Sequence, residues 1–191
     1  MLKNYTSLVN ARARLEPIYS VYVNTISSYK MALSLETAAL VWVLCEERKP
    51  SKIVDMGSGF SSFVVRHWAK TSGAEVWSVD DDASWLEKSR EFCQLTNVSV
   101  DNFATWEQFK NRGDKFDLVI YDLGRMPCRV TNIERALEFR EKMGVVVVDD
   151  MHKFNYGKEV KRLIEEKGLV GTDMSEATVD VHEGRHCWLA H

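Results

Sequence analysis

The chain has 191 residues, of which 45% are hydrophobic and 28% are charged, and its formal net charge is −3. This length and composition fit one globular domain better than two. Lysine and arginine form no continuous basic run, which disfavours nucleic acid as a partner. The longest apolar run, residues 38–45, is too short to cross a bilayer, and the first residues lack the layout of a signal peptide. We therefore expect a cytoplasmic protein with no membrane partner.

Hydrophobic periodicity predicts a helical beginning and then strands that alternate with helices. Residues 33–49 have helical spacing, and Pro50 stops this helix. The predicted strands cover 52–56, 75–80, 98–100, 116–121 and 145–148, and the later helices cover 61–71, 82–95, 105–112, 131–143 and 156–167. This alternation predicts an α/β fold with a mostly parallel sheet.

The two ends of the chain have different patterns. Residues 177–181 and 185–190 are β-like runs around a Glu-Gly pair, which predicts a hairpin or an antiparallel edge. Residues 1–50 are predicted to form a helical N-terminal extension to a main domain of residues 51–191. We expect this extension to be a lid over the substrate or a contact with a second copy of the chain, so a homodimer stays open.

The main domain begins with a predicted strand that ends near an acid and is followed by a turn at two glycines. Residues 53–62 read Ile-Val-Asp-Met-Gly-Ser-Gly-Phe-Ser-Ser. Gly57 and Gly59 permit a sharp turn and let a ligand approach the backbone, because no Cβ intervenes. Ser61 and Ser62 can begin the next helix, whose free N–H groups face the same ligand. The pattern predicts a pocket for a nucleoside with a polar or cationic tail.

Acidic residues follow four of the predicted strands. They are Asp55, Asp80 with Asp81 and Asp82, Asp122, and Asp149 with Asp150. Parallel strands bring their carboxyl ends to one rim, where ligands bind. Asp80 follows the glycine turn by about twenty residues, where a carboxylate can accept the hydroxyls of a ribose. Asp82 could equally well cap the helix after it, and Asp117 is expected to lie away from the rim.

Three segments, residues 53–62, 79–80 and 116–122, resemble the successive motifs of class I S-adenosylmethionine-dependent methyltransferases. The resemblance extends from residue 51 to the end of the chain. It implies a Rossmann-like, doubly wound sheet of seven strands with an antiparallel last strand. The chain departs from the usual glycine-rich loop at its third small position, which is Ser61.

The resemblance also implies S-adenosylmethionine as cofactor, with the first glycine-loop residues around its methionine part and Asp80 on its ribose. Phe60 or Trp106 could lie against the adenine. The cofactor-binding residues implied in this way are Asp55, Gly57, Ser58, Gly59, Phe60, Ser61, Ser62, Asp80, Asp81 and Asp122.

The residues after the fourth and fifth strands bear on the methyl acceptor. Residues 122–125 read Asp-Leu-Gly-Arg, without the Asn/Asp-Pro-Pro-aromatic turn of enzymes that methylate base amino groups. Asp122, Asp149 and Asp150 instead resemble the acidic trio of catechol- and caffeoyl-type O-methyltransferases. That resemblance implies a small hydroxylated acceptor and a divalent cation such as Mg²⁺, which would make the acceptor hydroxyl more acidic. Asp150 is a departure, because that family commonly has Asn there.

A metal-free route is the alternative. His152 follows Asp150 closely and could act as a general base, since the pKa of histidine lies near neutrality. Arg125 could orient an anionic acceptor, although both residues could also be ordinary loop residues. The predicted catalytic residues are Asp122, Arg125, Asp150 and His152.

Two other enzyme functions are disfavoured by the residues at, or around, their motifs. Binding of a nicotinamide dinucleotide requires Gly-x-Gly-x-x-Gly, and Ser62 stands where the last glycine should be. Residues 182–186 read His-Glu-Gly-Arg-His like a zinc peptidase, but the central glycine and the β-like flanks disfavour the helix which that chemistry needs. A nucleoside-binding protein of the same fold that transfers no group stays open.

Overall fold

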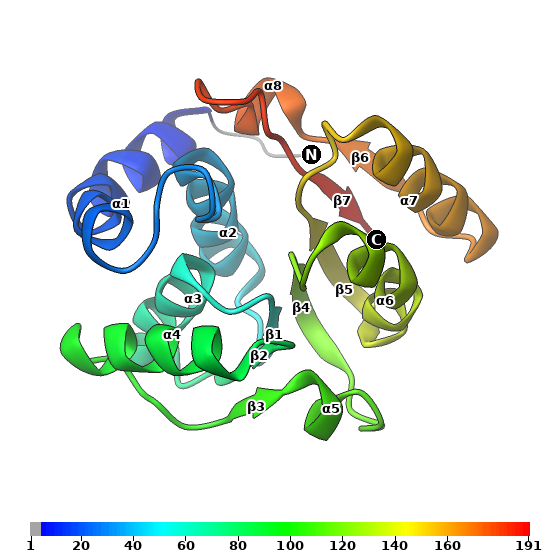
Figure 1. Cartoon of the computed structure of the whole chain (residues 1–191). Coiled ribbons are helices and arrows are strands. Elements are labelled where there is room, and N and C mark those ends of the chain that lie inside the picture. Colours follow the sequence, from blue (N-terminus) through cyan, green and yellow to red (C-terminus); the bar gives the residue numbers. More distant parts are fainter. Residues whose placement is uncertain (1–4) are drawn as a thin grey trace.

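The computed structural model describes residues 5–191 as an α/β protein (Figure 1). The helices are α1 (Tyr5–Thr25), α2 (Leu35–Arg48), α3 (Phe60–Ser72), α4 (Ala83–Leu95), α5 (Trp106–Phe109), α6 (Met126–Glu138), α7 (Phe154–Glu166) and α8 (Ser175–Thr178). The strands are β1 (Lys52–Met56), β2 (Glu75–Asp80), β3 (Phe103–Thr105), β4 (Phe116–Tyr121), β5 (Arg140–Val148), β6 (Gly171–Asp173) and β7 (Trp188–Ala190).

The strands form one seven-stranded sheet in the order β3-β2-β1-β4-β5-β7-β6. The pairs among β1 to β5 are all parallel, whereas β7 runs antiparallel to both β5 and β6. The predicted fold class is therefore confirmed, including the reversed last strand. The strand order changes direction between β1 and β4, which is where open α/β sheets bind ligands.

Alternating side chains of the central strands divide the core in two. Ile53, Leu118 and Val147 point to the face that α1 to α4 cover. Val54 and Val119, their neighbours in the chain, point to the face that α5 to α7 cover. Figure 1 shows these two helical layers on opposite sides of the sheet. Both layers leave the carboxyl ends of β1, β2, β4 and β5 open for a site.

Strands β1, β2 and β4 have the predicted bounds, whereas β3, the start of α6 and the start of β5 are clearly displaced from theirs. The third strand forms at residues 103–105 instead of 98–100, because Asn97 and Asn102 take φ values of 56° and turn the chain between them. Helix α6 begins earlier than predicted, since Pro127 sits in its first turn, where its missing N–H costs nothing. Strand β5 then takes the residues that were assigned to the end of that helix.

The antiparallel edge is confirmed, but its predicted partner strand is wrong. Strand β7 pairs with residues 171–173, while residues 175–178 form α8 instead of a strand. The Asp180 carboxylate accepts hydrogen bonds from the N–H groups of Glu183 and Arg185, which closes a turn here. Residues 182–186 thus lie in a turn and the segment after it, without the helix that a zinc peptidase needs.

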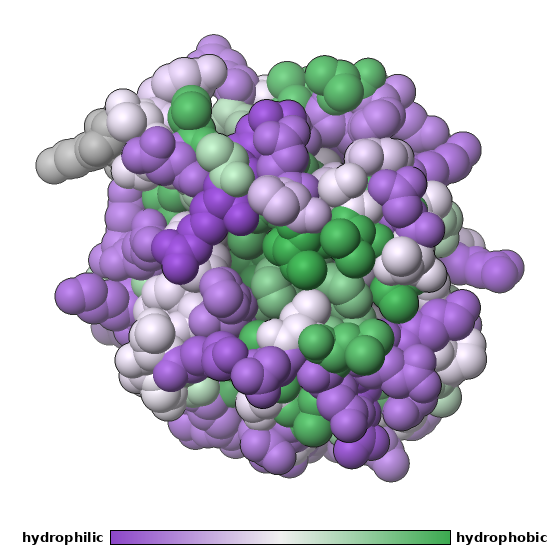
Figure 2. All heavy atoms as spheres, turned by 90° about the vertical axis from the view of Figure 1, so that its left-hand side faces the viewer, coloured by the Kyte–Doolittle hydropathy of each residue, from purple (hydrophilic) through white to green (hydrophobic). Residues whose placement is uncertain are grey.

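The described part of the N-terminal 50 residues consists of two helices that pack on each other, and α2 also packs on α3. Ser34 caps α2 by accepting the N–H of Thr37, and the helix ends before Pro50 as predicted. The side of the molecule that carries α1 has a hydrophobic region at its centre, framed by hydrophilic residues (Figure 2). The role of this part as lid or interface, and the division at residue 50, stay predictions. Residues 1–4 lie outside the described part.

None of the helices in residues 5–191 is long and apolar enough to span a membrane.

Candidate functional site

The glycine loop between β1 and α3 lies tightly against the neighbouring strands. The Gly57 N–H donates to the Val79 carbonyl oxygen of β2 at 2.8 Å. At a φ of 105°, a Cβ on Gly57 would lie 2.5 Å from the carbonyl carbon and oxygen of Asp122. Only glycine therefore fits at this position. The loop, β2 and the end of β4 form one rigid corner.

Asp55 supports this loop from behind. Its side chain is fully buried, and Ser62 donates its hydroxyl to Oδ2 of Asp55 at 2.5 Å. The Gly59 N–H in turn donates to the Ser62 hydroxyl at 3.3 Å. Burial raises the pKa of Asp55 to about 7. The structure thus places Asp55 and Ser62 in the support of the loop and not among the residues that line the cavity.

A cavity of about 610 Å³ opens at the carboxyl ends of β1, β2 and β4. This volume lies within the usual range for small-molecule sites. The other eight predicted cofactor residues all line it, and they are Gly57, Ser58, Gly59, Phe60, Ser61, Asp80, Asp81 and Asp122.

Asp80 is the buried acid of this cavity. The Ser58 hydroxyl donates to its Oδ2 at 2.9 Å, and the Asp82 N–H donates to its Oδ1 at 3.0 Å. Burial raises the pKa of Asp80 to about 6. Each carboxylate oxygen can accept a further hydrogen bond, as two ribose hydroxyls would require. Asp82 itself caps α4 through the N–H groups of Ser84 and Trp85.

Several wall residues were not predicted as site residues. Trp85 is half-buried on the cavity wall, and its Nε1–H donates to the Ser58 carbonyl oxygen at 2.7 Å. Residues 31–33 and Tyr22 contribute the wall on the N-terminal side. The Phe60 ring packs edge-on against Tyr19, with 4.9 Å between ring centroids. Trp106 packs in the core on the other face of the sheet and does not line the cavity.

A second cavity, of about 480 Å³, lies beside the first at the ends of β4 and β5. Asp122, Arg125 and Arg129 line both cavities, and Asp149 and Asp150 line the second. Of the predicted catalytic and metal residues, the second cavity thus brings together Asp122, Arg125, Asp149 and Asp150. A ligand in the first cavity and a ligand in the second would meet at Asp122.

Arg129 stands among these carboxylates. Its Nη1 lies 2.6 Å from Oδ1 of Asp122 and also pairs with Oδ2 of Asp150. Its Nη2 donates to the carbonyl oxygens of Asp122 and Gly124, both at 2.9 Å. Lys153 adds a second positive charge, with Nζ 2.5 Å from Oδ2 of Asp150. Asp122 and Asp150 are therefore neutralised by groups of the chain itself.

This arrangement does not fit the divalent cation implied by the resemblance. The guanidinium of Arg129 already lies between Asp122 and Asp150, and a cation there would be repelled by it. Within residues 5–191, no group of three His, Cys, Asp or Glu side chains is arranged to hold a metal ion. We therefore assign no step of the chemistry to a metal.

The acids of the second cavity differ in their surroundings. Asp149 is 3% exposed, and its Oδ1 has no hydrogen-bond partner among the described residues. Burial, reinforced by the neighbouring Asp122 and Asp150, raises the pKa of Asp149 well above its usual value. Burial also raises the pKa of Asp122, to about 6, although Arg129 opposes this effect. Asp150 takes a φ of 62°, a conformation that residues other than glycine rarely adopt.

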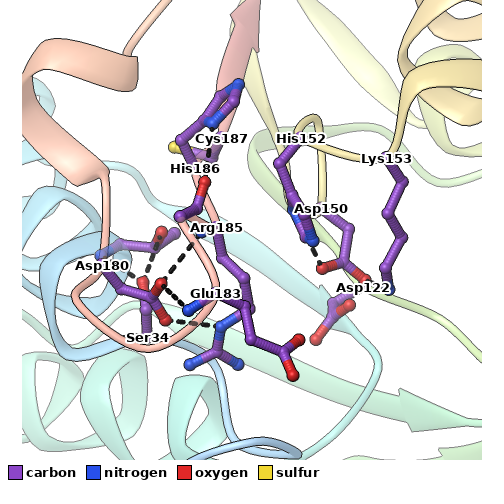
Figure 3. A network of polar contacts seen from close by, with 12 residues as sticks. Ser34, Asp122, Asp150, His152, Lys153, Asp180, Glu183, Arg185, His186 and Cys187 are labelled. Carbon is purple, nitrogen blue, oxygen red and sulfur yellow. Dashed lines mark hydrogen bonds and ion pairs between the residues drawn. The ribbon is translucent and has the colours of Figure 1, made fainter.

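His152 lies behind Asp150. Its Nδ1 is 3.7 Å from Oδ1 of Asp150, and its ring faces His186, with 6.3 Å between the centroids (Figure 3). It lines neither of the two cavities. Burial lowers the pKa of His152. His152 therefore contacts the second cavity only indirectly, through the Asp150 carboxylate that lines it.

Arg185 holds the wall that covers both cavities. Its side chain is buried and pairs with Asp180 at 2.6 Å (Figure 3). The guanidinium also donates to the carbonyl oxygens of Tyr29, Lys30 and Ala32, at 2.7, 3.2 and 2.8 Å. The segment of residues 29–32 is thus fixed against the turn before β7.

No protein-family model matches the sequence, and no curated protein matches it significantly. Solved structures do match in fold. An O-methyltransferase of tomaymycin synthesis from Streptomyces achromogenes, in complex with S-adenosylmethionine, is 16% identical over all of this chain and 90% of its own, with a TM-score of 0.63. An O-methyltransferase from Bacillus cereus, in complex with S-adenosylhomocysteine, is 12% identical over all of this chain and 92% of its own, with a TM-score of 0.63.

A methyltransferase from Podospora anserina, also bound to S-adenosylhomocysteine, is 12% identical over 97% of this chain and 87% of its own, with a TM-score of 0.63. Identities this low establish the fold alone. Together with the strand order, these matches show that the chain has the fold of the class I S-adenosylmethionine-dependent methyltransferases.

Proposed function

We propose that the protein is an S-adenosylmethionine-dependent methyltransferase that methylates a hydroxyl of a small molecule. The observation that supports this most strongly is the meeting of two cavities at Asp122. The first has the glycine loop and a buried acid for a nucleoside, and the second has acids suited to a hydroxyl group. The matched structures that bind this cofactor or its product have the same fold.

In this proposal the first cavity holds S-adenosylmethionine, with Asp80 accepting its ribose hydroxyls and the loop at Gly57 to Gly59 following its methionine part. The cofactor supplies, when bound, a methyl group on a positively charged sulfur that a nucleophilic oxygen can attack. Trp85 keeps the loop in position through its hydrogen bond to Ser58. Asp55 and Ser62 act on the same loop from behind.

The second cavity holds the acceptor. Asp122 is the best placed proton acceptor, because it lines both cavities and its pKa of about 6 is close to a neutral working pH. Asp149 is a further candidate, since its Oδ1 is free of protein partners among the described residues. Arg125 is exposed beside both cavities and is placed to orient an anionic part of the acceptor. Much of the catalysis would come from alignment of donor and acceptor.

A protein that binds the cofactor without transferring the methyl group is the second candidate. The observation that favours it is the neutralisation of Asp122 and Asp150 by Arg129 and Lys153. A nicotinamide-dependent oxidoreductase is disfavoured, since Ser62 fills the place of the third glycine with a hydroxyl bonded to Asp55.

Calorimetric titration with S-adenosylmethionine and S-adenosylhomocysteine tests the proposal, followed by transfer of a labelled methyl group to a panel of hydroxylated compounds. Asp80→Ala should weaken binding by about ten- to a hundredfold, because it removes hydrogen bonds to a charged acceptor worth roughly 1.5–3 kcal/mol. Asp114→Ala, near the opposite end of β4, is the matched control. Absence of binding to the native protein would refute the methyltransferase proposal, and binding without transfer to any acceptor would favour the second candidate.

A further inference from the structure

We propose that Arg129 is a built-in cation that occupies a latent divalent-metal site, so that the acid cluster at the ends of β4 and β5 works without a metal ion. The role of Arg129 in methyl transfer rests on the proposed function. The presence of its guanidinium between Asp122 and Asp150, in the place of a metal ion, is independent of the proposed function.

The oxygen atoms around Arg129 are those that a hard cation takes. Four oxygens surround its two terminal nitrogens, namely one carboxylate oxygen each from Asp122 and Asp150 and the carbonyl oxygens of Asp122 and Gly124. Ions such as Mg²⁺ and Mn²⁺ are bound by carboxylate and carbonyl oxygens. Asp149 adds a buried Oδ1 that lines the same cavity and has no partner among the described residues. A ligand set of the right chemistry is therefore present, with a guanidinium in its middle.

The fold holds Arg129 firmly in this place. Its side chain is 9% exposed, and it lies in the first turns of α6, where its N–H donates to the Arg125 carbonyl oxygen. The Tyr121 hydroxyl donates to the Arg129 carbonyl oxygen at 2.6 Å, which fixes the backbone against the end of β4. Asp150 keeps its unusual φ of 62° while it pairs with both Arg129 and Lys153. The contact is thus built from several elements at once.

The charge balance points in the same direction. In the native protein, Arg129 and Lys153 balance the two carboxylates that they contact. A divalent cation would add two positive charges to a balanced cluster, which Coulomb repulsion opposes. Removal of the Arg129 charge leaves the carboxylates in excess, with open oxygens. Arg129 is accordingly a positioning residue, which keeps Asp122 and Asp150 in place for the acceptor.

Titration with Mn²⁺, followed by the electron paramagnetic resonance of free Mn²⁺ and by the melting temperature, tests this inference. The native protein should bind no Mn²⁺ at the cluster. Arg129→Met, which keeps an unbranched, flexible side chain but removes the guanidinium and its charge, should gain one Mn²⁺ site and melt at a higher temperature when Mn²⁺ is present. Arg129→Lys, which keeps the charge, should gain none. Addition of Asp150→Ala to Arg129→Met should remove the new site, because alanine supplies no ligand oxygen.

The inference is overturned if the native protein binds Mn²⁺ at a site that Asp150→Ala removes, or if folded Arg129→Met gains no site. Should Arg129→Met fail to fold, the titration of the native protein decides alone. Binding of S-adenosylmethionine is measured separately on the native protein. Its failure would refute the proposed function and leave the result on Arg129 unchanged.

Discussion

Trp85 of α4 is tied to Ser58 of the glycine loop by a hydrogen bond from the indole Nε1–H to the carbonyl oxygen, at 2.7 Å. The two residues come from elements on either side of β2, and both line the first cavity. The bond therefore holds the loop in the shape in which it would meet a cofactor. Such preorganisation lowers the entropy that binding costs.

Trp85→Phe should weaken the binding of S-adenosylhomocysteine by up to about fivefold, the equivalent of one hydrogen bond of about 1 kcal/mol. Trp77→Phe is the matched control, because its Nε1–H donates to the exposed Glu75 away from both cavities. Calorimetry on the two variants makes the comparison. An equal loss of affinity in the Trp85→Phe and Trp77→Phe variants would show that the Trp85 hydrogen bond has no special role in binding.

Gly57→Ala should destabilise the protein by about 3 kcal/mol or more, because it combines a positive φ with overlap of the Asp122 backbone. Gly73→Ala also has a positive φ, of 75°, but its Cβ would meet nothing within 4 Å. We expect that control to cost only about 1 kcal/mol. Urea denaturation gives both free energies of unfolding, and equal values would contradict the tight fit of the loop.

Three buried acids should make the free energy of unfolding fall as the pH rises from about 4 to 7, an effect that the lowered pKa values of His67, His152 and His191 partly oppose. Burial raises the pKa of Asp55 to about 7 and those of Asp80 and Asp122 to about 6, from a usual value of 3.8. In this pH range the folded state keeps protons that the unfolded state has released, so a higher pH favours unfolding. Melting temperatures measured across the range test this prediction.

Asp55→Asn isolates the contribution of one group to that slope. The variant should lose less stability than the native protein between pH 4 and pH 8, because residue 55 then has no proton to release. At pH 4, residue 55 is neutral in both folded proteins. The difference between their free energies of unfolding at this pH is therefore the reference for the comparison. Identical slopes would mean that Asp55 is ionised in the folded state even at low pH.

Cys128 offers a direct probe of the first cavity. It is exposed and lines that cavity, whereas Cys45, Cys93 and Cys187 are buried. A thiol reagent such as dithiobis(nitrobenzoic acid) should modify one thiol quickly in the folded protein, and S-adenosylhomocysteine should slow this reaction. Cys128→Ser should abolish the fast phase. A fast phase that bound S-adenosylhomocysteine leaves unchanged would place the ligand elsewhere.

The sequence predicts the elements that its local patterns specify. Strands β1, β2 and β4 are short runs rich in aliphatic and aromatic residues, and the glycines at 57 and 59 mark the turn that the structure contains. The convergence of Asp122, Asp149 and Asp150 follows from the parallel sheet, because parallel strands end at one rim. Helix α6 begins before the predicted residue 131, because Pro127 is compatible with a first helical turn, where proline is common.

Local sequence patterns do not predict contacts between elements that are distant in the sequence. Arg129 meets Asp150 only because α6 packs beside the end of β5, and nothing in the spacing of the two residues indicates this. Helical periodicity places Trp85 on the inner face of α4, but it does not tell whether that face meets the core or a cavity. The residue type and the position after a strand make His152 a candidate base, while the direction of its ring depends on the packing around Asp150.

The bond between the Arg185 guanidinium and the Tyr29 carbonyl oxygen joins residues 156 positions apart. Met31 and Ala32, which line both cavities, therefore lie in a segment held by a residue that the ribosome adds long after the glycine loop has emerged. During synthesis the nascent chain can fold its central strands and still have an open site. The first cavity is complete only when the turn before β7 has closed, by which point almost the whole sheet exists.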